Sequence, residues 1–320
     1  MTSVEQHIPV LKREALSALN IHASGVYVDA TLGRGGHARA ILEQLGPEGR
    51  LIGFDRDPQA VELGRAMFAG DQRVRVVHSE FARMLQEIKQ LADINGVDGV
   101  LMDLGVSSPQ LDQAERGFSF LRDGALDMRM DTTQGESAAD WLARVEEREL
   151  MMVLFDLGEE RFARRIARAI VEQRAEAPIM TTHQLAEIIA QATPKKDKHK
   201  HPATRSFQAI RLHVNQELTQ VNEALPQAVE LLNEGGRLAV ISFHSLEDRI
   251  VKRFIRDLST PSLPPKNIPV SADMYRTPLK PIGKAIKPSA EEIARNTRAR
   301  SAVLRVAERT DVPYAGGAHA

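Results

Sequence analysis

The stretch VYVDATLGRGGHARAILEQLGPEGRLIGFDRDP, residues 26–58, decides the fold of this chain. It opens with an apolar run, residues 26–28, whose β-branched and aromatic side chains favour a strand, and Ala, Ile and Leu then recur at helical spacing over residues 38–45. Between them lies a glycine loop, GRGGH at residues 33–37. Glycines at a strand-to-helix turn let the backbone come close to a ligand. The order of strand, loop and helix therefore predicts a ligand site at this turn.

The second half of the stretch indicates what the ligand is. Residues 50–55 read as another strand, which ends on Asp55. An acid about twenty residues past a glycine loop can accept hydrogen bonds from both hydroxyls of a ribose. A glycine loop alone also fits a plain tight turn, but the strand before it and the acid after it favour a nucleotide-type cofactor.

The same glycine motif fits two cofactors. Gly33, Gly35 and Ala38 satisfy the dinucleotide fingerprint G-x-G-x-x-G/A and also the looser loop of S-adenosylmethionine enzymes. Asp29 ends the first strand just before the glycines. A pyrophosphate gains nothing from a nearby carboxylate, whereas a cationic sulfonium is attracted to one. We therefore expect S-adenosylmethionine rather than NAD.

Length and charge set broad limits. A chain of 320 residues can bury a substantial core, and its net charge of −1 gives no overall nucleic-acid signature. Any nucleic-acid surface must then be local. The first residues lack a secretory pattern, and no apolar run approaches the roughly 18 residues of a membrane span. We expect a cytoplasmic protein.

The chain contains no cysteine. This excludes disulfides, thiolate zinc sites and a cysteine nucleophile. Methylation of cytosine at ring carbon 5 normally requires a cysteine, and zinc deaminases require cysteine ligands. If the substrate is a base, we expect a nitrogen or oxygen acceptor and no metal.

Strand and helix patterns alternate from residue 26, which predicts an α/β fold with a parallel sheet of about seven strands and helices on both faces. The spacing becomes wholly helical near residue 111 and alternates again after residue 212. We expect a first part of the α/β domain at 1–110, an inserted all-helical domain that recognises the substrate at 111–212, and the second part of the α/β domain at 213–320.

Three acids close predicted strands, namely Asp29, Asp55 and Asp103. Ligands of such sheets bind beyond the carboxyl ends of the strands, so these carboxylates should share one edge. Phe81 follows the third strand, where it fits either an adenine wall or the core. His244, in ISFHSLEDR, falls between a strand and a helix that we expect Ser245 and Asp248 to cap.

The predicted insert carries two candidate nucleic-acid features. In the first, Arg116, Phe118, Phe120 and Arg129 combine aromatic rings for stacking bases with cations for phosphates, although both Phe could instead pack under the loop. The second is a cationic run that includes Lys195, Lys196, Lys198, Lys200 and Arg205. A solvated surface is the usual explanation of such a run, but its concentration in a nearly neutral chain favours RNA or DNA contact.

The motifs GRGGH, FDRDP, DLGVSSPQLD, ERGFSF, DMRMD, KHPATRSFQAIR and ISFHSLEDR occur together in this order. With them the chain resembles the MraW family of bacterial ribosomal RNA methyltransferases over residues 7–309. The resemblance implies a class I, Rossmann-like methyltransferase fold with a helical insert. It also implies methylation, from S-adenosylmethionine, of the exocyclic amine (N4) of a cytidine in the decoding region of small-subunit ribosomal RNA. The cofactor contacts that it implies are Gly35, Gly36, His37, Asp55, Phe81, Asp103 and Gln110.

The chain departs from other amine methyltransferases after the fourth strand. Those enzymes often have an acid, Asn or Ser, then Pro-Pro and an aromatic, whereas this chain has Ser107-Ser108-Pro109-Gln110. Candidates for the missing aromatic clamp are Phe118, Phe120 and Phe243. As catalytic residues we expect Asp103 and Ser108 near the amine, with His244 as a second candidate proton acceptor.

Two other classes of function stay open at this stage. One is an NAD-dependent dehydrogenase, and the other is a non-catalytic RNA-binding assembly factor with a vestigial cofactor fold. The expected partner is small-subunit ribosomal RNA within an assembled or assembling subunit, and the sequence leaves a homodimer open.

Overall fold

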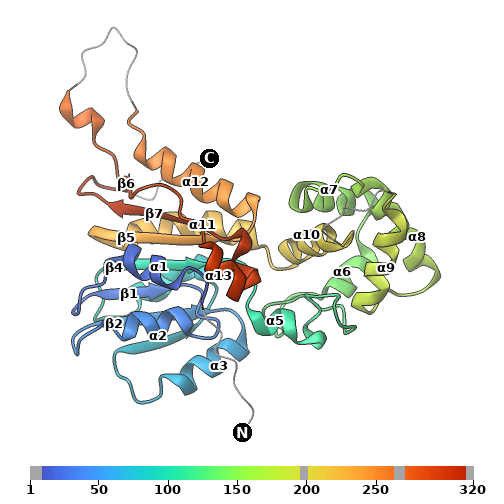
Figure 1. Ribbon diagram of the computed structural model, residues 1–320, viewed down its shortest axis with the longest axis horizontal. Coiled ribbons are helices and arrows are strands. Elements are labelled where there is room, and N and C mark those ends of the chain that lie inside the picture. Colours follow the sequence, from blue (N-terminus) through green and yellow to red (C-terminus); the bar gives the residue numbers. More distant parts are fainter. Residues whose placement is uncertain (1–8, 195–200, 263–270, 315–320) are drawn as a thin grey trace. The chain divides into compact units, whose positions relative to one another are not determined.

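The computed structural model describes residues 9–194, 201–262 and 271–314 (Figure 1). The chain forms two compact units. The first, here called the sheet unit, combines Met1–Gly105 with Thr219–Ala320, and the second, here called the insert, is Val106–Leu218. In the described part of the chain, every helix is too short or too polar to cross a membrane.

The sheet unit is built on a seven-stranded sheet in the order β3-β2-β1-β4-β5-β7-β6 (Figure 1). Its first five strands pair in parallel, and β7 runs antiparallel to both of its neighbours. The strands are β1 Val26–Asp29, β2 Arg50–Asp55, β3 Val74–His78, β4 Val97–Asp103, β5 Leu232–Ser242, β6 Leu279–Pro281 and β7 Val303–Arg309. The predicted α/β sheet of about seven strands is confirmed.

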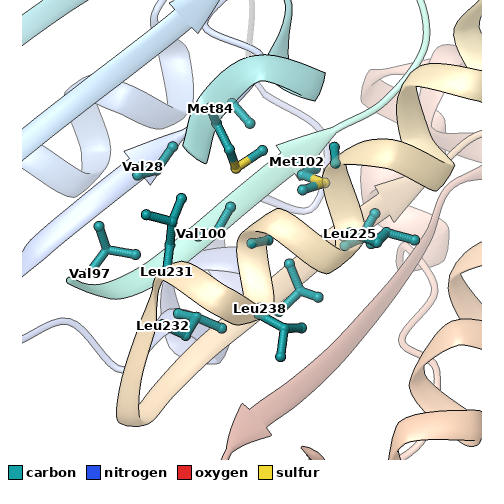
Figure 2. Close-up of a cluster of buried hydrophobic side chains, with 14 of the residues drawn as sticks. Val28, Met84, Val97, Val100, Met102, Leu225, Leu231, Leu232 and Leu238 are labelled. Carbon is teal, nitrogen blue, oxygen red and sulfur yellow. The ribbon is translucent and has the colours of Figure 1, made fainter. Parts of the chain in front are cut away.

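Helices cover both faces of the sheet because alternate strand residues point to opposite sides. In β4, Val100 and Met102 belong to one buried cluster with α4 and α11, shown in Figure 2, whereas Leu101 belongs to the cluster on the other face with α1 and α2. The helices and turns of this unit are α1 Lys12–Leu19, α2 Gly36–Leu42, α3 Pro58–Met67, η1 Phe81–Arg83, α4 Met84–Lys89, α11 Glu217–Leu231, α12 Ser245–Ser259, η3 Ala272–Tyr275, α13 Ala290–Arg295 and η4 Thr297–Ser301.

The insert is helical and has a hydrophobic cluster of its own, which includes Trp141, Leu150, Ile166, Leu185 and Ile210. Its described residues contain no strand, apart from an isolated bridge between Ala125 and Thr181. The helices and turns are α5 Ser108–Asp112, η2 Ala114–Arg116, α6 Ala138–Arg144, α7 Glu147–Gly158, α8 Ala163–Glu176, α9 Thr182–Ala192 and α10 Thr204–Val214.

The spacing of apolar residues and glycines also predicts helices over residues 138–148 and 159–172 and a turn at residues 234–236, and the structure differs from all three for local backbone reasons. Residues 138–148 do not form one helix, because the extended ψ of 138° at Val145 ends α6. The second helix begins only at Ala163, because Glu159 takes a left-handed conformation that ends α7. Residues 234–236 form an irregularity within β5, where Gly235 has φ of 78° and the register with β4 shifts.

Candidate active site

Three carboxylates lie at one edge of the sheet, as the strand ends predict. Asp29, Asp55 and Asp103 are the last residues of β1, β2 and β4. β1 lies between the other two strands, and Asp29 pairs in register with Gly53 of β2 and Leu101 of β4. The carboxyl ends of parallel strands form the usual ligand crevice of such sheets.

The glycine loop between β1 and α2 requires glycine for conformational and steric reasons. Gly33 and Gly35 have φ of 51° and 68°, in the left-handed region that side chains disfavour. A Cβ on Gly36 would lie 2.4 Å from Cγ of Pro9. Gly35 is also the N-cap of α2 and offers no side chain to the first-turn N–H groups. The loop is therefore shaped for close approach of backbone to a ligand.

A cluster of the buried Asp29 and His37 with the half-buried Asp103 lies beside this loop. Asp29 and His37 are 1% and 5% exposed, and Nε2 of His37 lies 3.6 Å from Oδ2 of Asp103. Four buried atoms have no hydrogen-bond partner among the described residues: Oδ2 of Asp29, Oδ1 of Asp103 and both ring nitrogens of His37. Buried polar groups are rarely left unpaired, so this cluster is suited to a polar ligand.

The charges of the cluster depend on one another. Burial raises the pKa of Asp29 to about 6, against the opposing effect of His37. For His37, burial lowers the pKa, but the carboxylates of Asp103 and Asp29 raise it more, and the net direction is upward. A buried carboxylate that is costly to ionise favours a cationic ligand, which removes part of that cost.

Asp55 is held by the loop that it faces. Its Oδ2 accepts the N–H of Gly33 at 2.7 Å, and its Oδ1 accepts the N–H of Asp57 at 2.8 Å. Burial raises its pKa to about 6, opposed by these backbone donors. Each carboxylate oxygen has a second lone pair, so the fixed side chain can still accept from ribose hydroxyls.

The other two expected cofactor contacts have structural roles. Phe81 is half-buried at the start of η1 and packs against the core of the sheet unit. Gln110 is buried in the insert, and its Oε1 accepts the N–H of Ser107 at 2.9 Å. Cofactor contact by these two side chains stays a prediction.

His244 is part of a helix cap, and the expected cap by Ser245 and Asp248 is wrong by one residue. His244 is the N-cap of α12, and its Nδ1 accepts the N–H of Glu247 at 3.5 Å while Nε2 lies 3.1 Å from Oε1 of Glu247. Asp248 instead binds Arg305 of β7 through two hydrogen bonds of 2.7 and 3.0 Å. With Nδ1 used in the cap, His244 is a weaker candidate for proton uptake than Asp103.

Ser108 lies in the insert as the first residue of α5 and is 7% exposed. Sequence reasoning missed Thr31, whose hydroxyl accepts the N–H of Asp103 at 2.7 Å and so ties the loop after β1 to the end of β4. Its position two residues after Asp29 was the available signal. It also missed Glu247, whose Oε2 accepts the N–H of Phe243 at 2.8 Å, although an acid at the third helical position is a known capping signal.

The first expected RNA feature is packed into the insert. Arg116 is 4% exposed and donates to the carbonyl oxygens of Arg129 and Met130, with its guanidinium 5.8 Å from the ring centre of Phe118. Phe118 is 6% exposed. The half-buried Phe120 packs against the rings of His201 and Phe207 (centroids 4.6 and 4.8 Å). Packing therefore accounts for both Phe side chains and for Arg116, and base stacking by them gains no support.

Base stacking was not expected of the other candidate RNA contacts, which are Arg129, Arg205 and four lysines. Arg129 makes a bidentate pair with Asp127, at 2.7 and 2.8 Å. Arg205 is half-buried on α10 and donates to the carbonyl oxygen of Glu159 at 3.3 Å. The lysines of the basic run, Lys195, Lys196, Lys198 and Lys200, lie outside the described residues.

Fold and site together define a class of enzyme. A classic dinucleotide fold has a parallel sheet in the order 3-2-1-4-5-6, whereas here the antiparallel β7 lies between β5 and β6. This sheet, the glycine loop and the buried carboxylates define an S-adenosylmethionine-dependent methyltransferase of class I.

Comparison with known proteins agrees. The model of the MraW methylase family matches residues 4–310. The chain is 57% identical to "Ribosomal RNA small subunit methyltransferase H" of Alteromonas mediterranea over 95% of this chain and 97% of the relative. It is 55% identical to proteins of the same name from Pseudoalteromonas atlantica, over 97% and 100%, and Nitrosospira multiformis, over 97% and 99%. The chain belongs to the MraW methylase family.

Similarity to solved structures is weaker than the similarity to these relatives. The crystal structure of an rRNA methylase from Streptococcus thermophilus superposes with a TM-score of 0.41 at 10% identity, covering 94% of this chain and 95% of the other.

Proposed function

We propose that this enzyme transfers a methyl group from S-adenosylmethionine to the exocyclic amine of a cytidine in the decoding region of small-subunit ribosomal RNA. The names of its 55–57% identical relatives support small-subunit ribosomal RNA as the substrate. The resemblance of its motifs to those of the MraW family supports the exocyclic amine as the methyl acceptor. The observation that carries the proposal is the Asp29–His37–Asp103 cluster with its buried, unpartnered polar atoms.

The residues of the sheet unit fit the cofactor. Asp55 would hold the ribose hydroxyls, and Asp29 would face the positive charge, at the buried end of the crevice. When bound, S-adenosylmethionine supplies an electrophilic methyl group on a sulfonium. The low-dielectric environment of Asp29 and His37 strengthens electrostatic interactions with such a charge.

Asp103 is the residue best placed to act on the amine. Its Oδ2 faces His37, and its Oδ1 has no partner among the described residues. The hydroxyl of Thr31 fixes its backbone. Oδ1 can therefore accept a hydrogen of the amino group and favour a geometry in which the nitrogen lone pair leaves conjugation with the ring. Nε2 of His37, 3.6 Å from Oδ2, would help to hold the carboxylate of Asp103 in this position.

The absence of cysteine from the sequence argues against carbon 5 as the acceptor, because C5 methylation would need a covalent cysteine adduct to the ring, and it is compatible with the exocyclic nitrogen. Catalysis would then consist mainly of positioning and electrostatic stabilisation.

The test is methyl transfer from tritiated S-adenosylmethionine to small ribosomal subunits from a strain that lacks this enzyme. Digestion of the RNA to nucleosides should place the label on N4-methylated cytidine. Label on a ribose or on carbon 5 would contradict the proposed acceptor. Binding of subunits without any label would indicate the non-catalytic assembly factor. Parallel reactions with naked RNA and assembled subunits identify which is the substrate, and light scattering of the enzyme distinguishes a monomer from a homodimer.

A further inference from the structure

A row of arginines lies on the insert, outside the two features that we expected to contact RNA. Arg161 precedes α8, and Arg164, Arg165 and Arg168 lie on α8, and all four are exposed. Residues 164, 165 and 168 project from neighbouring positions of one helix surface, because side chains three and four residues apart lie on the same face. Within the described part of the chain, none of the four makes a hydrogen bond or ion pair.

The placement of these arginines opposes the stability of the helix. A helix N-terminus carries partial positive charge and is stabilised by acids, but the first turn of α8 has no acidic residue and two arginines. The acids of this helix, Glu172 and Glu176, lie in its second half and are exposed. A cluster of like charges at this end of a helix does not stabilise it electrostatically and is suited to an anionic partner.

A hollow adjoins the arginine row. α8 and α9 lie side by side within the insert (Figure 1). The hollow between them has a volume of about 570 Å³. Its polar lining consists of Arg165 and Arg168, the amides of Gln173 and Gln191, and the carboxylates of Glu172 and Glu176. Amides both donate and accept hydrogen bonds, which suits the edges of an unpaired base.

We propose that the first half of α8 is an RNA-binding surface, on which the phosphates of a single-stranded segment contact Arg164, Arg165 and Arg168 and an adjacent base enters the α8–α9 hollow. This inference rests on the proposed function, since the RNA is the substrate itself. The carboxylates of Glu172 and Glu176 repel phosphates, so the strand crosses the first half of the helix and does not follow its full length. RNA is preferred over an acidic protein because a strand offers regularly spaced charges together with an unpaired base for the hollow.

The test compares the full-length enzyme with the triple variant R164Q/R165Q/R168Q. Glutamine is polar and has a helix propensity similar to that of arginine, but it carries no charge. Binding of small subunits from the deletion strain is measured between 50 and 200 mM salt. If three phosphate contacts are lost, the slope of log affinity against log salt becomes shallower by about 2, at roughly 0.7 per phosphate. Over this range the wild type should then weaken roughly 20-fold more than the variant.

A matched control removes the same charge elsewhere. The variant K280A/K284A/K287A changes three exposed lysines of the sheet unit whose side chains make no hydrogen bond or ion pair with other described residues, and its salt slope should equal that of wild type. A variant of opposite sign, E172Q/E176Q, should bind several-fold more tightly at 50 mM salt, because two repelling charges are removed. Melting temperature and S-adenosylmethionine affinity should not fall in R164Q/R165Q/R168Q.

The outcomes separate this inference from the proposed function. If the wild type neither binds nor methylates small subunits, the proposed function fails. If the wild type does both and R164Q/R165Q/R168Q keeps the wild-type salt slope, only the α8 surface is overturned. An equal loss in the triple lysine control would overturn it too, since the effect would then belong to overall charge.

Discussion

Asp29 is a buried carboxylate whose protonation is linked to both stability and ligand binding. Its folded pKa of about 6 lies above the value near 3.9 of an unfolded chain. The folded state therefore binds the proton more tightly, and this group lowers stability progressively as pH rises from about 4 to 6. Above pH 6 the ionised carboxylate costs the ligand-free protein at most roughly 3 kcal/mol. A cationic ligand offsets that cost.

We predict that Asp29→Asn makes the ligand-free enzyme as stable as wild type or more stable at pH 7.5, yet weakens its binding of S-adenosylmethionine at least tenfold. Its affinity for S-adenosylhomocysteine, which lacks the sulfonium charge, should fall less. Wild-type affinity for S-adenosylmethionine should rise from pH 5 to 7, and this rise should flatten in the variant. Calorimetric titration and thermal melting at several pH values measure both effects. Equal losses for the two ligands would show that Asp29 does not respond to the sulfonium.

Asp103 has one oxygen near His37 and one free of protein partners among the described residues. Asp103→Asn preserves the shape of the side chain but removes its charge. We predict at least a tenfold fall in the single-turnover rate at saturating S-adenosylmethionine. Asp93→Asn, which changes an exposed carboxylate paired with Arg75, is the control and should keep the wild-type rate. A wild-type rate in Asp103→Asn would mean that the carboxylate takes no part in the chemistry.

At the scale of single elements, side-chain hydrogen bonds and an ion pair hold the first turn of α12 in place. His244 and Glu247 satisfy backbone donors at the first turn, and the Asp248–Arg305 pair joins the helix to β7. The imidazole therefore has a structural role that a sequence pattern alone cannot separate from a catalytic one. Both roles place a polar residue directly after a strand.

The pair His244→Asn and His244→Ala separates these roles. Asn is a strong N-cap, so His244→Asn should keep stability and activity, whereas His244→Ala should lose about 1 kcal/mol of unfolding free energy. Chemical denaturation and methyl-transfer rates measure the two effects. If the imidazole takes up the proton, both variants lose activity to the same extent.

At the scale of the whole molecule, two units carry separate hydrophobic clusters. The cluster of the insert contains Trp141, the single Trp of the chain, whereas Tyr27 lies in the sheet unit. Tryptophan fluorescence therefore reports unfolding of the insert, and calorimetry reports both units. The site residues Asp29, His37, Asp55 and Asp103 belong to the sheet unit.

We predict two thermal transitions, of which S-adenosylmethionine raises only that of the sheet unit. At a concentration 100 times its Kd, a ligand stabilises the state that binds it by about 2.7 kcal/mol. The calorimetric transition of the sheet unit should shift, and the fluorescence transition of Trp141 should not. A common shift of both signals would show that the two units unfold as one.

The basic run gives a second prediction at this scale. Replacing Lys195, Lys196, Lys198 and Lys200 with alanine should weaken RNA binding without changing S-adenosylmethionine affinity. If all four neutralise phosphates, the salt slope becomes shallower by about 3, at roughly 0.7 per phosphate. A slope equal to that of wild type, with normal cofactor binding, would identify the run as a solvated surface.

Local patterns predicted much of the sheet unit. β1 and β2 have the predicted bounds, because apolar runs that end on Asp29 and Asp55 leave little freedom in strand length. The glycines of residues 33–37 marked the turn because glycine adopts its left-handed conformations without the strain that a side chain would add. The shared edge of the three acids followed from parallel pairing.

What only the tertiary structure decided depends on contacts between distant residues. Burial raised the pKa of Asp29 and left its Oδ2 without a partner among the described residues, and no local pattern encodes the exposure of a single side chain. Arg116 and Phe118 read as a surface motif in sequence but are packed into the insert. Conversely, the sequence of α8 has the pattern of an ordinary amphipathic helix. Only the structure shows that its arginines are exposed and have no partner among the described residues. Sequence determines which groups are present and in what order, whereas folding determines which of them remain available to a ligand, because availability depends on what packs against each group.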